Sequence, residues 1–220
     1  GRLESVREEE AYRAVREWVL TRRCALDQPL ELADLARTLQ QDPGHVAYAL
    51  VRLAGEGVVT RTTDGRYLPT PLTVELADEL FGARCLIELG VADACVGEIP
   101  EDDLAVLDDY ATRLGTIVAR DDADLAEFLD ASHGYHCHFV GLGGSPQLVD
   151  TYRRLGISTL WRRAFAEQDW RTQFDVTHHA ALTGACRAGD VDLARRHIRD
   201  HTQQVRRLVR DVIDKAGGAL

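Results

Sequence analysis

The apolar spacing near the end of the chain is the feature that most constrains its fold. From position 190 to position 213, apolar residues recur every three or four positions, which is the spacing of one helix face. The pattern predicts a long helix that is buried along this face, with one imidazole among its apolar members. The stripe consists of Leu193, Ala194, Ile198, His201, Val205, Leu208, Val209 and Val212.

Two more histidines fall on sides of helices that should be buried. His179 lies one turn before Leu182, and His136 lies one turn after Ser132 and close to Phe139. Three imidazoles from three helices can thus point into one interior volume. A buried imidazole costs free energy unless it is paired, and imidazole is the commonest metal ligand in proteins. The pattern predicts a helical domain with a metal or anion site at its centre.

The chain after the Pro69-Thr70-Pro71 linker is typical of an all-helical domain. Gly189-Asp190 separates the last two helices, as a glycine stop followed by an aspartate start, and Asp121-Asp122 is expected to cap an earlier one. A bundle of six or seven helices over residues 72–220 is large enough to enclose a ligand. The expected helices before the closing pair cover residues 73–96, 101–120, 125–140, 147–154 and 157–167.

The first 69 residues predict a winged helix-turn-helix domain. Helices are expected over 4–23, 30–39 and 45–55, the third of them capped by Asp42. Residues 58–68 then read as a β-hairpin with an Asp64-Gly65 turn. In this fold the third helix enters the major groove of DNA. A three-helix cap with a hairpin and no DNA contact is the alternative.

The composition fits a globular cytoplasmic protein. The chain has 220 residues, a net charge of −10 and five scattered cysteines without a Cys-x-x-Cys spacing, which favours reduced thiols. No apolar run reaches the roughly 20 residues that span a membrane. The negative charge argues against a general polyanion binder. The first 70 residues, however, carry ten arginines against eleven acidic residues, so a local DNA contact is compatible with the sequence.

The order of these parts resembles the GntR family of bacterial transcription regulators, in the subfamily with a C-terminal FCD (fatty-acid-responsive type) ligand domain. The resemblance covers nearly the whole chain and rests on several motifs at matching distances. These are Leu32-x-x-Leu35-Ala36-x-x-Leu39, Leu50-x-x-Leu53-x-x-Glu56-Gly57, Arg84-x-x-x-Glu88, Tyr135-His136 ten residues before Pro146, and His179 with Gly189-Asp190 and His201.

The resemblance implies a metal site formed by His136, His179 and His201. Zinc is the ion that three imidazoles favour. Ser132 stands where the family has a carboxylate ligand, and a serine hydroxyl is a poor substitute. Core imidazoles that hydrogen-bond to one another are the alternative.

The resemblance also implies that Arg84, with Glu88 one turn later, holds an effector carboxylate. A purely structural Arg84–Glu88 pair explains the same spacing, so both interpretations stay open.

The turn before the third helix departs from the family. The family usually carries two arginines there that contact DNA, whereas this chain reads Asp42-Pro43-Gly44-His45-Val46-Ala47-Tyr48-Ala49. Arginine makes the usual bidentate contacts to guanine, so the family's sequence preference does not carry over. The remaining candidates for DNA contact are His45, Tyr48, Arg52, Arg61 and Arg66.

These observations predict a homodimeric, ligand-responsive transcription regulator that binds a two-fold DNA operator and a small organic acid. The alternative is a ligand or metal sensor that has lost sequence-specific DNA binding. A metal-dependent enzyme is not expected, because no acid pair is placed as a general base and the N-terminal domain would have no role.

Overall fold

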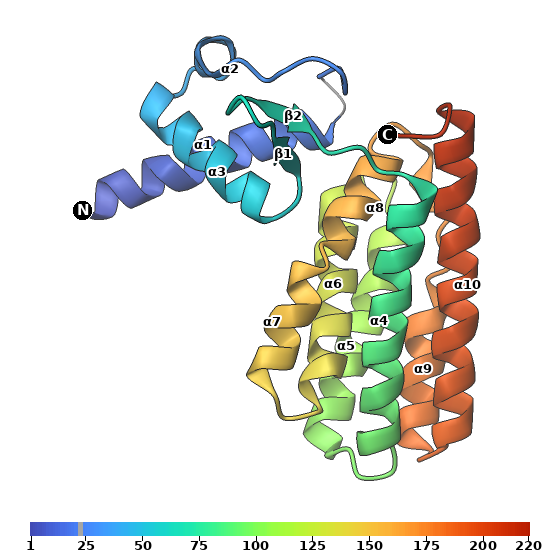
Figure 1. Cartoon of the computed structure of the whole chain (residues 1–220). Coiled ribbons are helices and arrows are strands. Elements are labelled where there is room, and N and C mark those ends of the chain that lie inside the picture. Colours follow the sequence, from blue (N-terminus) through green and yellow to red (C-terminus); the bar gives the residue numbers. More distant parts are fainter. Residues whose placement is uncertain (22–23) are drawn as a thin grey trace. The chain divides into compact units, whose positions relative to one another are not determined.

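The computed structural model describes residues 1–21 and 24–220 and divides into two compact units. One unit is Gly1–Leu72 with Ala219–Leu220, and the other is Thr73–Gly218 (Figure 1). The last two residues were predicted with the helical domain but belong to the first unit. Leu220 donates to and accepts from the backbone of Leu72, at 3.0 and 2.8 Å. Within the described residues, no helix is long and apolar enough to cross a membrane.

The first unit contains a helix-turn-helix. Its helices are α1 (Arg2–Leu20), α2 (Leu32–Leu39) and α3 (Pro43–Gly55). The first helix ends earlier than predicted, and residues 22 and 23 lie outside the described part. Asp42 caps α3 as predicted, because its carboxylate accepts from the backbone of Gly44 at 2.8 Å. The core of this unit includes Val15, Val19, Val46, Ala49, Leu50 and Leu53.

The wing of this unit is an antiparallel pair of short strands, β1 (Val59–Arg61) and β2 (Tyr67–Pro69). The Asp64-Gly65 turn is present, but only Gly65 has a positive φ, of +85°. The loop is closed by Thr62, whose N–H donates to the Arg66 carbonyl at 2.7 Å. This geometry is that of a three-residue hairpin loop, rather than the two-residue turn with positive φ at both positions.

The second unit is an all-helical bundle. Its elements are α4 (Val74–Cys95), α5 (Glu101–Ala119), α6 (Leu125–Gly141), α7 (Pro146–Arg154), α8 (Ile157–Phe165), the 3₁₀ turn η1 (Trp170–Thr172), α9 (Thr177–Arg187) and α10 (Val191–Lys215). Helix α4 packs on α10, α10 packs on α9, α9 packs on α5, and α5 packs on α6. Asp124 caps α6 in place of the predicted Asp121-Asp122, and Asp190 caps α10 as predicted.

The predicted stripe of α10 faces the bundle. Ala194, Ile198, Val205, Val209 and Val212 are buried, whereas Leu193, His201 and Leu208 are half-buried. Thr202 is buried beside the stripe, where its hydroxyl donates to the carbonyl of Ile198 at 2.9 Å. That bond satisfies the hydroxyl within the helix and allows a polar residue to face the core.

Candidate functional site

The structure brings the three predicted histidines together inside the second unit. His136 comes from α6, His179 from α9 and His201 from α10. The ring of His136 lies 5.2 Å from that of His179 and 6.1 Å from that of His201, measured between centroids. The imidazoles therefore share one interior volume.

A fourth imidazole, which the sequence analysis did not select, joins this cluster. His178 stacks on His201 with ring centroids 3.8 Å apart and an angle of 4° between the planes. Adjacent residues of a helix point about 100° apart, so only a helix with a wide buried face can turn both inward. Helix α9 has such a face, because Leu182, Thr183, Ala185 and Cys186 are all buried with His178 and His179.

A buried network of charged groups lies beside the histidines. Arg84 and Glu88 of α4 form an ion pair with Nε and Oε2 3.5 Å apart. Nη2 of Arg84 donates to Nε2 of His136 at 2.7 Å, and Nδ1 of His136 donates to Oε1 of Glu88 at 2.5 Å. This pairing places the imidazole proton on Nδ1 and uses both ring nitrogens of His136. The side chains of all three residues are almost completely buried.

The surroundings keep the clustered imidazoles neutral. Burial holds the pKa of His136, His178 and His201 well below the usual histidine value. For His136 the second cause of the low pKa is the Arg84 cation. Burial also lowers the pKa of His179, to about 4. The four clustered imidazoles are therefore neutral at neutral pH, and they lie beside the buried Arg84–Glu88 pair.

A small cavity of about 40 Å³ borders this cluster. Nδ1 of His201 is buried and has no hydrogen-bond partner among the described residues. Nδ1 of His179 is likewise buried, and its geometry makes no hydrogen bond to the described residues. Buried polar atoms without partners are rare in native proteins and indicate a site for water or a ligand. The lining of the cavity includes Arg84, Ser132, Trp161, Phe174, His179 and His201.

The predicted metal site is not formed by these side chains as they lie. Among residues 1–21 and 24–220, no three His, Cys, Asp or Glu side chains are arranged to hold a metal ion. The Nε2 lone pair of His136 is taken by Arg84, whose positive charge would also oppose a cation. Ser132 contacts Nε2 of His179 at 3.3 Å and adds no negative charge. Metal binding by His136, His179 and His201 therefore stays a prediction.

A larger hollow lies elsewhere in the second unit. It has a volume of about 650 Å³ and is lined by residues of both charges, including Glu98, Asp103, His138 and Arg153. Nε2 of His138 lies 3.0 Å from the Asp103 carboxylate, although the geometry does not make a hydrogen bond. The small cavity is the better candidate, because the buried Arg84 guanidinium borders it together with His179 and His201.

The structure turns two of the predicted DNA contacts toward other side chains of the first unit. Nε2 of His45 lies 2.6 Å from the carboxylate of Glu4. Arg52 donates to Glu9 at 2.7 Å, and its guanidinium lies 3.6 Å from the centre of the Tyr12 ring. We conclude that His45 and Arg52 stabilise the packing of α3 on α1.

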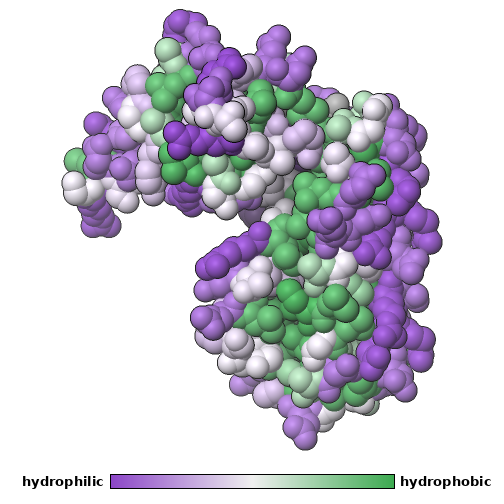
Figure 2. All heavy atoms as spheres, in the orientation of Figure 1, coloured by the Kyte–Doolittle hydropathy of each residue, from purple (hydrophilic) through white to green (hydrophobic). Residues whose placement is uncertain are grey.

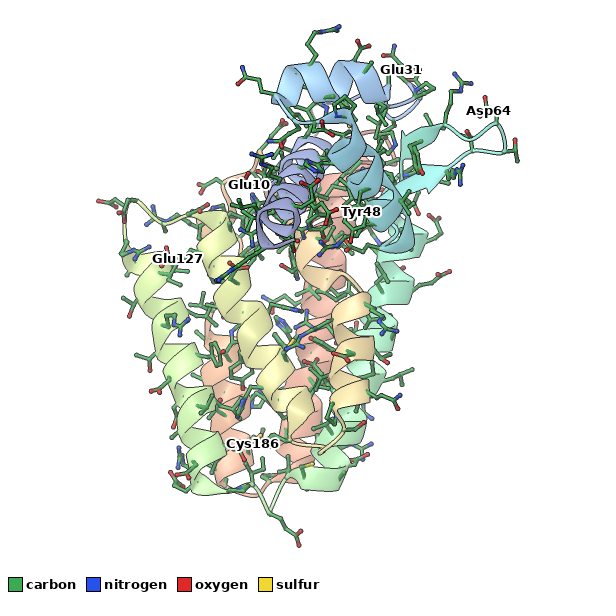
Figure 3. All side chains as sticks on the ribbon, turned by 90° about the vertical axis from the view of Figure 1, so that its left-hand side faces the viewer. Glu10, Glu31, Tyr48, Asp64, Glu127 and Cys186 are labelled. Carbon is green, nitrogen blue, oxygen red and sulfur yellow. The ribbon has the colours of Figure 1, made fainter. Side chains whose placement is uncertain are left out.

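The other three candidates lie at the surface. Tyr48 is 49% exposed on α3. In the wing, the Arg61 guanidinium lies 5.9 Å from the Tyr67 ring, and Arg66 donates to Asp64 at 2.8 Å. Asp64 projects at the tip of the hairpin in Figure 3. Tyr48, Arg61 and Arg66 thus remain accessible to a partner.

Comparisons with known proteins agree with this architecture. A family model described as the FCD domain matches residues 79–204, more than half of the chain. A Streptomyces ambofaciens protein, named as an uncharacterized HTH-type transcriptional regulator in an unstable DNA locus, is 28% identical over 205 residues. The alignment covers 88% of this chain and 81% of that protein.

Two solved structures show the same fold at low sequence identity. McbR/YncC of E. coli has a TM-score of 0.69 at 15% identity, over 92% of this chain and 96% of that one. A GntR transcriptional regulator of Rhodococcus sp. RHA1 has a TM-score of 0.68 at 17% identity, over 93% and 97%.

A helix-turn-helix unit with a wing and an all-helical FCD unit occur together in this chain, which is the architecture of a transcription regulator with a DNA-binding part. The chain belongs to the GntR family of transcription regulators, in the subfamily that carries an FCD domain. The resemblance noted in the sequence is confirmed.

Proposed function

We propose that this protein is a cytoplasmic, homodimeric regulator that releases or engages a DNA operator when a small carboxylate binds in its helical unit. The observation that carries the proposal is the small cavity, which is bordered by Arg84 and by His201, whose Nδ1 has no hydrogen-bond partner among the described residues. A guanidinium gives a carboxylate two parallel hydrogen bonds. The neutral imidazole can add a third bond.

The walls of the cavity favour an effector with an apolar body. Trp161, Phe128 and Phe174 line it, and the rings of Trp161 and Phe174 meet edge to face with centroids 5.1 Å apart. A volume of about 40 Å³ holds a water molecule or a small ion. A larger effector must displace side chains, and Gln173 and Phe174 belong to the short segment between η1 and α9. Movement of this segment is a route by which binding reaches the rest of the unit.

The outer face of α4 supports a homodimer. Phe81 and Val91 of this helix are buried, whereas Leu86 is 73% exposed. Figure 2 shows apolar side chains gathered on the face of the helical unit where Figure 1 places α4 and α7. An exposed apolar patch on a helical unit is often covered by a partner, and a two-fold partner presents the same surface. Further members of this face are Leu80, Ala83 and Ile87.

The proposal is tested by measuring DNA binding and assembly of the full chain together. We expect light scattering to give a dimer, and fluorescence anisotropy with the region upstream of the gene to show salt-sensitive binding. Leu86→Glu is expected to give a monomer that binds DNA much more weakly, because a monomer cannot contact both half-sites of the operator at once. Glu75→Gln on the same helix is the surface control. A monomeric protein without salt-sensitive binding to any upstream fragment contradicts the proposal.

The effector arm of this experiment uses a panel of small carboxylates and their matched primary amides. We expect some carboxylates, but not their amides, to raise the melting temperature and to shift DNA affinity, since only the acid pairs with Arg84. Coupling of this kind typically amounts to about 1–3 kcal/mol. Arg84→Lys should weaken the response, because lysine lacks the planar fork, whereas Arg195→Lys at the surface should retain it. An equal response to acids and amides contradicts the role of Arg84.

Zinc binding is decided by elemental analysis of protein purified without a histidine tag. Because Arg84 occupies Nε2 of His136, zinc binding at the predicted site requires that Arg84 first leave this nitrogen. One ion per chain, lost on His201→Ala and retained on His197→Ala, would support the predicted site, whereas protein that holds no zinc contradicts it.

A further inference from the structure

The outward face of α3 carries no charged side chain. Residues 44, 47, 48, 51 and 55 share this face by helical spacing, and they are glycine, alanine, tyrosine, valine and glycine. Val51 is 60% exposed and Tyr48 is 49% exposed, the latter labelled in Figure 3. The only polar atom that these five side chains offer is the Tyr48 hydroxyl.

The basic groups of α3 are turned away from this face. His45 and Arg52 are the two residues of the helix that can carry a positive charge. His45 is paired with Glu4 and its side chain is only 12% exposed. Arg52 lies between Glu9, Glu56 and the Tyr12 ring. Each is neutralised by acidic residues, so neither has a free guanidinium or imidazolium to offer guanine.

We infer that α3 recognises operator thymines through their 5-methyl groups. This inference rests on the proposed function, in which α3 enters the major groove. The thymine methyl is the apolar group that base pairs present there, and alanine and other apolar side chains contact it. Ala47, Tyr48 and Val51 form a surface of that chemistry, whereas guanine recognition needs paired donors that this face lacks.

The wing supplies the sequence-independent part of binding. Arg61 and Arg66 belong to the hairpin and are exposed. Contacts of arginine to phosphate fix the register of the protein on DNA without reading the bases. The general affinity for DNA and the preference for thymine therefore come from different residues, and mutations can change them separately.

The test begins with selection of binding sites for the full-length protein from a random duplex library. In the selected sites each thymine is then replaced by deoxyuridine, which removes the methyl group and leaves every hydrogen-bonding atom in place. We expect one or two thymines per half-site at which this change weakens binding about fourfold, the value that corresponds to one buried methyl-sized group. The remaining thymines should be insensitive.

Matched variants assign the effect to α3. Val51→Ser removes both γ-methyl groups and should abolish the deoxyuridine penalty at one position, whereas Tyr48→Phe should retain the penalties. Arg61→Ala should weaken binding to the thymine and uracil duplexes equally. It should also reduce the slope of log affinity against log salt concentration by about one. Selected sites that bind equally well with uracil overturn the inference and leave the proposed function intact. Selection that recovers no DNA overturns both.

Discussion

Acidification from about pH 7.5 to about pH 5 is expected to destabilise the helical unit by several kcal/mol, because it protonates histidines in the unfolded chain but not in the folded one. The folded pKa of His179 is about 4, against an ordinary value of 6.5. That difference in pKa lowers the free energy of unfolding by about 3 kcal/mol once the pH is below both pKa values. His136, His178 and His201 add to it in the same direction.

The sign of this dependence follows from which state binds more protons. Above pH 6.5 the imidazoles are neutral in both states and contribute no pH dependence. As the pH falls through 6.5 toward about 4, the unfolded chain takes up protons that the folded chain excludes, so the free energy of unfolding falls. Below the folded pKa the loss no longer grows.

Urea denaturation in the presence of a chelator measures this dependence, with Trp161 and Trp170 reporting from the helical unit. The variant His178→Asn should flatten the change between the two pH values, because it removes one excluded imidazole. His197→Asn, on α10 but outside the cluster, should leave the wild-type slope. A free energy of unfolding that is equal at both pH values would show that the imidazoles are not kept neutral by burial.

The fold was largely readable from the sequence because its signals are local. Asp42-Pro43 and Gly189-Asp190 mark helix ends through bonds that span a few residues, and the stripe of α10 depends only on helical spacing. The Asp121-Asp122 cap was predicted wrongly because several acidic residues precede α6 and each of them could cap it. The structure shows that Asp124 is the one whose carboxylate accepts from the helix backbone.

The site was less predictable because its decisive contacts join distant residues. Nothing near His136 in the sequence indicates that Arg84, 52 positions away, takes its Nε2. Likewise, Arg52 was a candidate for DNA contact, but its guanidinium donates to Glu9, which lies 43 positions earlier on α1. Spacing identifies which residues share a face. It does not identify the partner that the opposite element supplies, and that partner decides whether a histidine can bind metal or an arginine can bind DNA.

Removal of either charge of the buried Arg84–Glu88 pair is expected to have the largest effect of any single substitution in the helical unit. Arg84→Met leaves the Glu88 carboxylate without its cation, and Glu88→Leu leaves the guanidinium without its anion, and both side chains are almost completely buried. An unpaired buried charge costs about 3–5 kcal/mol. Whole domains are stable by about 5–15 kcal/mol, so each variant should be folded only marginally.

The double variant Arg84→Met/Glu88→Leu distinguishes a buried pair from two independent contacts. Removing both charges eliminates the unpaired ion, so the double variant should be more stable than the sum of the single losses predicts, by several kcal/mol. It should not reach wild-type stability, because His136 then has no partner at either ring nitrogen. Urea denaturation of the wild type, the two single variants and the double variant gives the coupling free energy between Arg84 and Glu88. Arg195→Met, which breaks an exposed pair with Asp93, should cost less than about 1 kcal/mol. Strictly additive losses would mean that His136, rather than the ion pair, holds Arg84 and Glu88 in place.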